Sequence, residues 1–145
     1  MSVRLPDTIR GRLPYLLARA NLRQLEVFER HTRAFDIAAR EYAVMLLLEA
    51  HDALWQSQIA QALRLDRTTV TYLVDGLEKR GWLMRNRDPA DRRAHVVGLT
   101  GAGQKALADI QPAVTESKKE LLAPLSEAEQ DQLRDLLARL IVEEP

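Results

Sequence analysis

One strand–turn–strand segment interrupts a chain that otherwise has the pattern of amphipathic helices, and this interruption restricts the fold more than any other feature. Residues 82–87 and 94–99 are predicted strands, because Val97 and Leu99 alternate with residues that point to the opposite face. The turn between them is Asp88-Pro-Ala-Asp-Arg-Arg93. Elsewhere, apolar residues recur at the spacing of helices. The predicted fold class is therefore mainly α, with a small two- or three-stranded β element.

The helices are predicted from this spacing and from their capping residues. Asp66, Thr100 and Ser126 are N-cap candidates, since a side-chain oxygen at this position accepts backbone N–H groups of the first turn. Gly81 suits the left-handed residue that ends a helix, and Pro112 is expected to bend the helix that contains it. Pro14 lies close enough to the start of the first helix either to occupy its first turn or to kink it. The predicted helices are residues 7–35, 39–50, 55–63, 66–80, 101–122 and 126–142.

The composition excludes several classes of protein and site. The 145 residues include no cysteine, which excludes disulfides, thiolate metal sites and thiol-based sensing. The longest apolar run, residues 44–48, is too short to cross a bilayer, and the sequence has no signal-peptide pattern, so we expect a cytoplasmic protein without membrane contact. Gly-rich phosphate loops, nucleophile motifs and metal-ligand spacings are absent from the sequence, so we predict no enzyme, no cofactor and no metal site.

The formal net charge is zero, but the charge is unevenly distributed. Residues 79–93 contain six basic and two acidic residues, a local charge of +4, whereas residues 109–145 contain four basic and nine acidic residues, a local charge of −5. The acidic segment fits solvated helix faces. The basic charge lies on the predicted hairpin, which favours contact with a polyanion, and a plain surface hairpin is the alternative. Asp91 is expected to pair with a neighbouring arginine and hold the hairpin tip.

The order of the elements is that of a winged helix-turn-helix, in which two helices joined by a tight connection are followed by a hairpin, or wing. An α-helix fits the major groove of B-DNA, where residues near its N-terminus reach the base edges. Residues 66–80 place an arginine and several threonines there, and Arg92 and Arg93 at the wing tip suit the electronegative minor groove. The predicted DNA contacts are Gln56, Ser57, Arg67, Thr68, Thr69, Thr71, Tyr72, Arg87, Arg92 and Arg93.

Three segments carry a resemblance to a known family. They are residues 58–81, the turn at residues 88–93 with its Asp-Arg-Arg sequence, and Val97-Gly-Leu-Thr-Gly-Ala-Gly103. Together they resemble the MarR family of transcriptional regulators. The resemblance implies that the terminal helices interlock with those of a second subunit and that the wing arginines enter the minor groove. It also implies a cleft for a small aromatic or phenolic anion whose binding lowers the affinity for DNA.

The sequence departs from the family pattern at three positions. Arg64 stands in the turn between two helices where glycine is common. Tyr72 and Gly76 stand where arginine is common, which changes the side chains that the helix offers to DNA.

The apolar faces of the predicted helices 7–35 and 126–142 are wider than a small winged-helix body could cover, so a homodimer is also predicted from the residues themselves. Two such subunits would bind half-sites about 10 base pairs apart, or a multiple of that, in a pseudo-palindromic operator on double-stranded DNA. The predicted organisation is a single domain of residues 1–145, with dimerisation helices in 1–36 and 101–145 and a DNA-binding lobe in 37–100.

The predicted function is a homodimeric, sequence-specific transcriptional regulator, in the simplest form a repressor released by a small aromatic or phenolic effector. A winged-helix module that binds another protein without sequence-specific DNA binding is the alternative. Candidate effector contacts have aromatic, basic or thioether side chains, although such residues at helical spacing also occur in ordinary cores. They are Tyr15, His31, Arg33, Tyr42, Met45 and Trp55.

Overall fold

The computed structural model describes residues 3–141, and it is mainly helical with one two-stranded antiparallel sheet, which confirms the predicted fold class. The elements are α1 (Asp7–Arg10), α2 (Leu13–Thr32), the 3-10 turn η1 (Arg33–Phe35), α3 (Ala39–Ala50), α4 (Gln56–Leu63), α5 (Arg67–Lys79), β1 (Leu83–Arg87), β2 (His95–Leu99), α6 (Gly101–Leu122) and α7 (Glu127–Leu140). From α3 onward the predicted bounds agree with these to within two residues. The predicted end of the last helix at residue 142 lies outside the described residues.

The long helix predicted over residues 7–35 is interrupted near its start, while the first-turn position expected for Pro14 is confirmed. α1 ends at Arg10, and a short break separates it from α2. Pro14 occupies the first turn of α2, where its fixed φ suits a helix start, but proline cannot continue a helix from a preceding turn. At the other end of α2, η1 leads to Asp36 in the left-handed conformation, with φ 48°. The chain therefore turns sharply between α2 and α3.

A single hydrophobic core lies between α3, α4, α5, the two strands and the part of α6 up to Ile110, and we call this part of the molecule the lobe. Its deepest side chains, Met45 of α3, Ile59 of α4 and Leu77 of α5, are fully buried. Burial contributes about 1.5–3 kcal/mol to folding for each such side chain. Because the core continues into α6, it crosses the lobe boundary predicted at residue 100.

The hairpin is attached to the body of the lobe by backbone pairing. β1 and β2 pair along their length as antiparallel strands. Leu54, in the connection between α3 and α4, exchanges two backbone hydrogen bonds with Val97 of β2, at N–O distances of 3.0 and 2.8 Å. This bridge acts as a short third strand and fixes the root of the wing.

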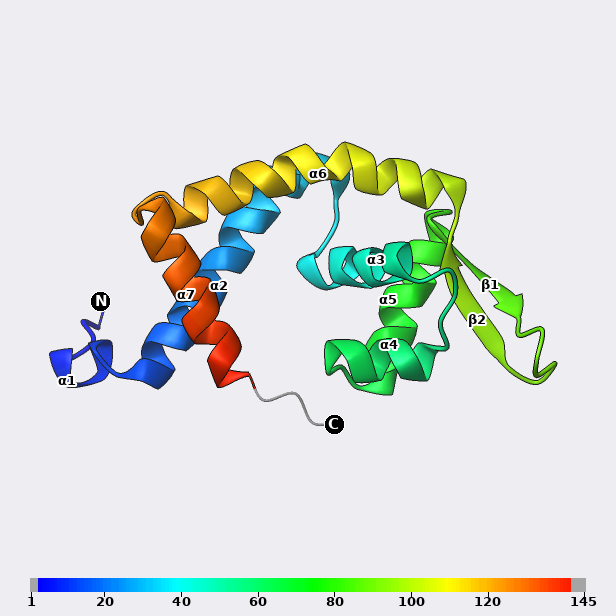
Figure 1. Cartoon of the computed structure of the whole chain (residues 1–145), viewed down its shortest axis with the longest axis horizontal. Helices are drawn as coiled ribbons and strands as arrows, with labels where there is room; N and C mark the ends of the chain where they lie inside the picture. The colour runs from blue at the N-terminus through cyan, green and yellow to red at the C-terminus, as the bar shows by residue number, and fades with distance from the viewer. Residues whose placement is uncertain (1–2, 142–145) are drawn as a thin grey trace.

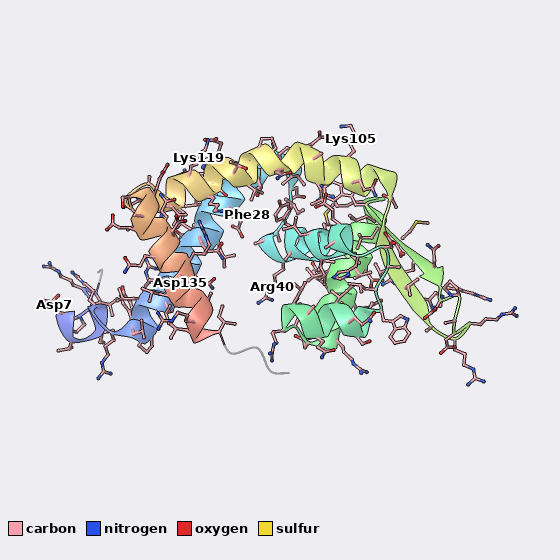
Figure 2. The ribbon with its side chains drawn as sticks, in the orientation of Figure 1. Asp7, Phe28, Arg40, Lys105, Lys119 and Asp135 are labelled. Carbon is pink, nitrogen blue, oxygen red and sulfur yellow. The ribbon has the colours of Figure 1, made fainter. Side chains whose placement is uncertain are left out.

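The remaining helices form an extended arm, made up of α1, α2, α7 and the part of α6 beyond Ile110. Figure 1 shows α6 running along one side of the whole molecule, over the lobe at one end and over α2 at the other. Lys105 and Lys119 project from the outer face of α6 (Figure 2). Phe28 lies on the inner side, and its ring centroid is 5.8 Å from that of Tyr42 in α3. α6 thus connects lobe and arm as one helix, which continues through Pro112.

The arm leaves much of its apolar surface uncovered. α7 has no buried residue, and together with α2 and the end of α6 it lines an apolar groove of about 450 Å³. An apolar surface of this extent marks an interaction site. The exposed leucines are Leu13, Leu16, Leu17, Leu22, Leu133, Leu136, Leu137 and Leu140.

None of the helices in residues 3–141 combines the length and the apolar character needed to cross a bilayer. Over the same residues, His, Asp and Glu side chains do not gather in a group of three that could hold a metal ion.

Candidate nucleic-acid interface

α5 begins with the cap predicted from the sequence. The Asp66 carboxylate accepts the backbone N–H of Thr69 at 2.8 Å and the hydroxyl of Thr69 at 2.6 Å. The hydroxyl bond first, and the backbone bond second, lower the pKa of Asp66 below its usual value. The Thr69 hydroxyl proton is therefore used inside the helix start, so Thr69 is not a free donor for DNA.

The other predicted contacts on α5 face outward. Arg67, Thr68 and Tyr72 are exposed, and Tyr72 is 78% exposed. Thr71 is also exposed, but its hydroxyl donates to the Arg67 carbonyl at 3.0 Å and accepts from Nε2 of Gln56 at 3.1 Å. The first turns of α5 thus offer one arginine, one unbonded threonine hydroxyl and one aromatic ring to a partner.

Gln56 and Ser57 begin α4 and lie beside the start of α5. They line a hollow of about 340 Å³ together with Arg67 and Thr71. Besides bonding Thr71, Gln56 accepts Nε of Arg85 from β1 on its Oε1, at 3.3 Å. The N-terminal ends of α4 and α5 therefore form one continuous polar surface.

Arg85 fastens the hairpin to α5. Its Nη1 donates to Glu78 at 2.7 Å, and its Nη2 donates to Asp75. The Arg85 side chain is only 23% exposed. Because both partners are carboxylates, this cation is neutralised within the protein and is not available to a polyanion. The local charge of the hairpin overstated its free positive charge for this reason.

A second link joins the hairpin to α4. Trp55, the N-cap residue of α4, donates its indole N–H to the Asp88 carboxylate at 2.7 Å. The other Asp88 oxygen accepts the backbone N–H of Ala90 at 2.8 Å. The Ala90 bond, followed by the Trp55 bond, lowers the pKa of Asp88. The wing turn is therefore shaped by a carboxylate that stays charged at neutral pH.

The wing tip carries three exposed arginines, Arg87, Arg92 and Arg93. Their guanidinium groups make no hydrogen bond or ion pair with any residue between 3 and 141. The expected pairing of Asp91 with an arginine side chain is wrong, because its carboxylate instead accepts the backbone N–H of Arg93 at 2.9 Å. This local turn holds the tip and leaves the arginine side chains unpaired.

The arginines of the segment 79–93 thus divide into two groups. Arg80 and Arg85 bond to carbonyl or carboxylate oxygens of the protein, whereas the three arginines of the wing tip face solvent. In Figure 1, α4 and the wing tip lie on the side of the lobe opposite α6. The start of α5 lies beside the start of α4. This arrangement allows the start of α5 and the wing tip to contact one duplex, as a winged helix requires.

The six predicted effector contacts are not brought together. Met45 is fully buried in the lobe core, and Trp55 is bonded to Asp88 at the root of the wing. Tyr15 lies near the start of α2, at the opposite end of that helix from His31. These three positions therefore do not share a cavity within one chain.

The other three lie around the junction of α2 and α3. Arg33 lines a hollow of about 310 Å³ there. His31 is half-buried, and its Nε2 is 2.6 Å from a carboxylate oxygen of Glu120 in α6. Tyr42 packs against Phe28, and burial raises the pKa of its phenol. Arg33 shares the lining of this hollow with three acidic residues, Glu29, Asp36 and Glu41, and neither His31 nor Tyr42 lines it.

Glu120 was not singled out by the sequence, yet it joins α2 to α6. Arg30 donates both terminal nitrogens to it, at 3.0 and 2.6 Å, and Arg23 lies 3.7 Å away. The hydrogen bonds from Arg30, followed by that from His31, lower the pKa of Glu120 to about 2. The partners are about 90 positions apart in the sequence, so no local pattern could have found them.

Comparison with known proteins agrees with this geometry. Residues 37–95 match the model of the MarR family. The transcriptional regulator HosA of Escherichia coli O111:H- is 31% identical over 125 residues, which cover 83% of this chain and 91% of HosA. The chain belongs to the MarR family. MarR-family proteins are transcriptional regulators and not enzymes, so this chain is a DNA-binding regulator and the prediction that it is not an enzyme is confirmed.

Solved structures of MarR-family proteins have the same fold. The transcriptional repressor CouR bound to a 23-mer DNA duplex is 32% identical, with a TM-score of 0.89 and coverage of 96% of this chain and 99% of that chain. CouR from Rhodococcus jostii RHA1 bound to p-coumaroyl-CoA is 24% identical, with a TM-score of 0.80 and coverage of 95% and 100%, a likeness that shows the fold.

Two departures from the MarR-family pattern have visible consequences. Arg64 ends α4 in the left-handed conformation, with φ 53°, which costs a residue other than glycine about 1 kcal/mol or more. Gly76 lies one turn after Tyr72 in α5, and a Cβ there would meet nothing within 4 Å. The outward face of α5 therefore carries no side chain at position 76, one turn after Tyr72.

Proposed function

We propose that this MarR-family regulator is a homodimeric repressor of a pseudo-palindromic operator, with α5 in the major groove and the wing in the adjacent minor groove. The division of the arginines carries this proposal. The side chains of Arg80 and Arg85 bond to oxygens within the protein. Arg67, Arg92 and Arg93 are exposed and make no side-chain bond among the described residues. Guanidinium groups without an internal partner are those that bond guanine, enter a narrow minor groove and release counterions.

The dimer is proposed from the arm. Its leucines are exposed in a single copy, and the groove between α2, α6 and α7 has no occupant within residues 3–141. Apolar surface that leaves water contributes about 25 cal/mol per Å². A two-fold contact between two arms would cover the same surface on both copies and set the two α5 helices against one duplex.

Repression and its relief by an effector are proposed from the relatives. CouR is a repressor, and one CouR structure holds p-coumaroyl-CoA. We place a small aromatic or phenolic effector at the α2–α3 junction, where Arg33 lines a hollow together with Glu29, Asp36 and Glu41 and where His31 and Tyr42 are half-buried nearby. An effector there would favour one orientation of the lobe relative to the arm.

The test is fluorescence anisotropy with duplexes from the region upstream of the protein's own gene. We expect Arg93→Ala to weaken binding to all duplexes by about tenfold and to lower the slope of log affinity against log salt by about one. Arg67→Ala should lose discrimination between the operator and altered half-sites, by about 1–3 kcal/mol. Lys118→Ala removes an exposed cation from α6 and serves as the matched control.

Two results would contradict the proposal. An Arg93→Ala variant with unchanged affinity and salt slope would remove the wing from the interface. A wild-type protein that binds its upstream region no better than a random duplex would favour a protein-interaction module instead.

A further inference from the structure

The C-terminal end of α5 has a fixed backbone geometry. Gly81 adopts φ 77°, and its N–H donates to the Glu78 carbonyl at 2.9 Å. The N–H of Trp82 donates to the Leu77 carbonyl at 3.1 Å. These two bonds form a Schellman motif, which satisfies the last carbonyls of a helix. The position of residues 80–82 is therefore coupled to the direction of α5, so that a shift of one requires a shift of the other.

Arg80 joins this end of α5 to the connection between α2 and α3. Its Nη1 donates to the Asp36 carbonyl at 2.5 Å, and its Nη2 donates to the Phe35 carbonyl at 2.6 Å. The guanidinium carbon also lies 3.7 Å from the centroid of the Trp82 ring. Asp36 is the residue with a left-handed backbone at this sharp turn. The guanidinium thus clamps the point where the chain passes from the arm to the lobe.

The start of α6, the helix that continues from the lobe into the arm, meets Gly81 and Trp82, the two residues that follow Arg80. The N–H of Thr100 donates to the Trp82 carbonyl at 3.0 Å, and its hydroxyl donates to the Gly81 carbonyl at 2.6 Å. At Gly103, a Cβ would lie only 2.1 Å from the Trp82 carbonyl oxygen. The first turn of α6 therefore packs directly on the backbone of Gly81 and Trp82.

Two elements that lead from the lobe towards the arm, the turn between α2 and α3 and the helix α6, therefore bond to one short segment, which we call the joint and define as residues 80–82. We propose that Arg80 is a positioning residue, which sets the angle of α5 relative to α2 and α6. Only a guanidinium can span two carbonyl oxygens and stack on an indole at once, because it is planar and carries several fixed donors. In the proposed dimer, on which this consequence rests, the same angle sets the separation of the two α5 helices on DNA.

Arg80 is a basic residue directly after α5, but its bonding indicates a role other than DNA contact. Both terminal nitrogens are occupied by carbonyls of the turn. A phosphate contact would change the salt slope when removed, whereas a positioning residue should change the geometry and leave the salt slope unaltered.

The first experiment measures the angle without DNA. The chain has no cysteine, so Gln61→Cys in α4 and Lys118→Cys in α6 give two defined spin-label sites, both exposed. Pulsed electron spin resonance on labelled chains diluted with excess unlabelled wild type reports the lobe–arm distance within one chain. We expect Arg80→Gln to broaden this distance distribution or shift its maximum. Lys79→Gln, the same charge change one residue earlier, should leave it as in the unsubstituted double-cysteine protein.

The second experiment measures the consequence for DNA. Wild type should prefer one half-site spacing over spacings altered by one base pair, and Arg80→Gln should lose most of this preference while keeping the wild-type salt slope. Arg80→Lys keeps the charge but cannot hold both carbonyls, so it should show a smaller broadening and a smaller loss. It also provides a second variant should Arg80→Gln fold poorly.

The outcomes separate the two proposals. A wild-type protein without operator preference counts against the proposed function, and the distance measurement still tests the joint. An unchanged distance distribution in both folded Arg80 variants would overturn the positioning role, and so would a lowered salt slope with unchanged spacing preference.

Discussion

The lobe and the arm differ in how they dispose of their apolar side chains. In the lobe, Met45, Val74 and Leu77 are fully buried within one copy of the chain. In the arm, Leu137 and Leu140 remain 38% and 62% exposed. The polar links differ too, since Arg85 ties three elements of the lobe together while the arm depends on ion pairs around Glu120. One copy therefore completes the lobe, whereas the arm leaves an apolar surface that the second copy would cover in the proposed dimer.

The largest expected effect comes from placing charge in the arm groove. The double substitution Leu133→Asp/Leu137→Asp would put two carboxylates in an apolar interface, where each unpaired charge costs several kcal/mol, so the dimer dissociation constant should rise by about 1000-fold or more. Light scattering after gel filtration measures the mass. Ala138→Asp introduces a carboxylate on the exposed face of α7 opposite these leucines and should leave the dimer intact. A double variant that keeps the wild-type mass would show that this groove is not the interface.

A cavity in the lobe should have a smaller effect, and one that does not involve association. The Leu77 side chain is fully buried in the lobe core. Leu77→Ala should therefore lower the free energy of unfolding by about 2–5 kcal/mol. Urea denaturation measures this loss, and the dimer dissociation constant should stay unchanged. Leu140→Ala is the partner variant in the arm, with the opposite expectation: weaker association and little loss of lobe stability. If both variants lowered stability and association alike, the contrast between the regions would disappear.

The smallest expected effect concerns the ion pairs of the arm. The folded protein lowers the pKa of Glu120 from 4.5 to about 2, chiefly through its hydrogen bonds with Arg30 and then His31. A lowered pKa means that the contribution to stability is complete above the unfolded value and is lost as the pH falls from about 4.5 towards 2. Glu120→Gln should therefore reduce the thermal midpoint at pH 7, and its difference from wild type should shrink across that window.

Glu29→Gln removes another carboxylate from the surface of α2 and is the control for this pH series. A difference between Glu120→Gln and wild type that stays constant down to pH 2 would show that the ionised carboxylate is not what holds α2 to α6.

Most helix boundaries could be predicted because their signals are local. The side chains of Asp66, Thr100 and Ser126 each accept the backbone N–H three residues later, as their residue types indicated. Gly81 has the left-handed conformation expected of a helix end. The break between α1 and α2 was missed, because the apolar spacing continued through a segment that Pro14 interrupts. Periodicity describes which face is buried, and a proline overrides it.

The partners of the charged side chains could not be predicted in the same way. Arg80 bonds to carbonyls 44 and 45 positions away, and Arg30 meets Glu120 across 90 positions. Such contacts depend on how whole elements pack, and residue type shows only that an arginine needs acceptors. For this reason the sequence placed Arg85 in a basic surface, while the structure uses it as an internal brace.

The two tryptophans of the chain occupy the two ends of the recognition machinery. The Trp55 indole bonds to a carboxylate at the root of the wing, and the Trp82 ring lies beneath a guanidinium at the far end of α5. Indole fluorescence shifts with the charges around the ring, and here one ring has an anion as neighbour and the other a cation. The unmodified protein thus contains two intrinsic fluorescence probes. In the Trp55→Phe or the Trp82→Phe variant, only one tryptophan remains, and its fluorescence can be followed alone while an operator or an effector is added.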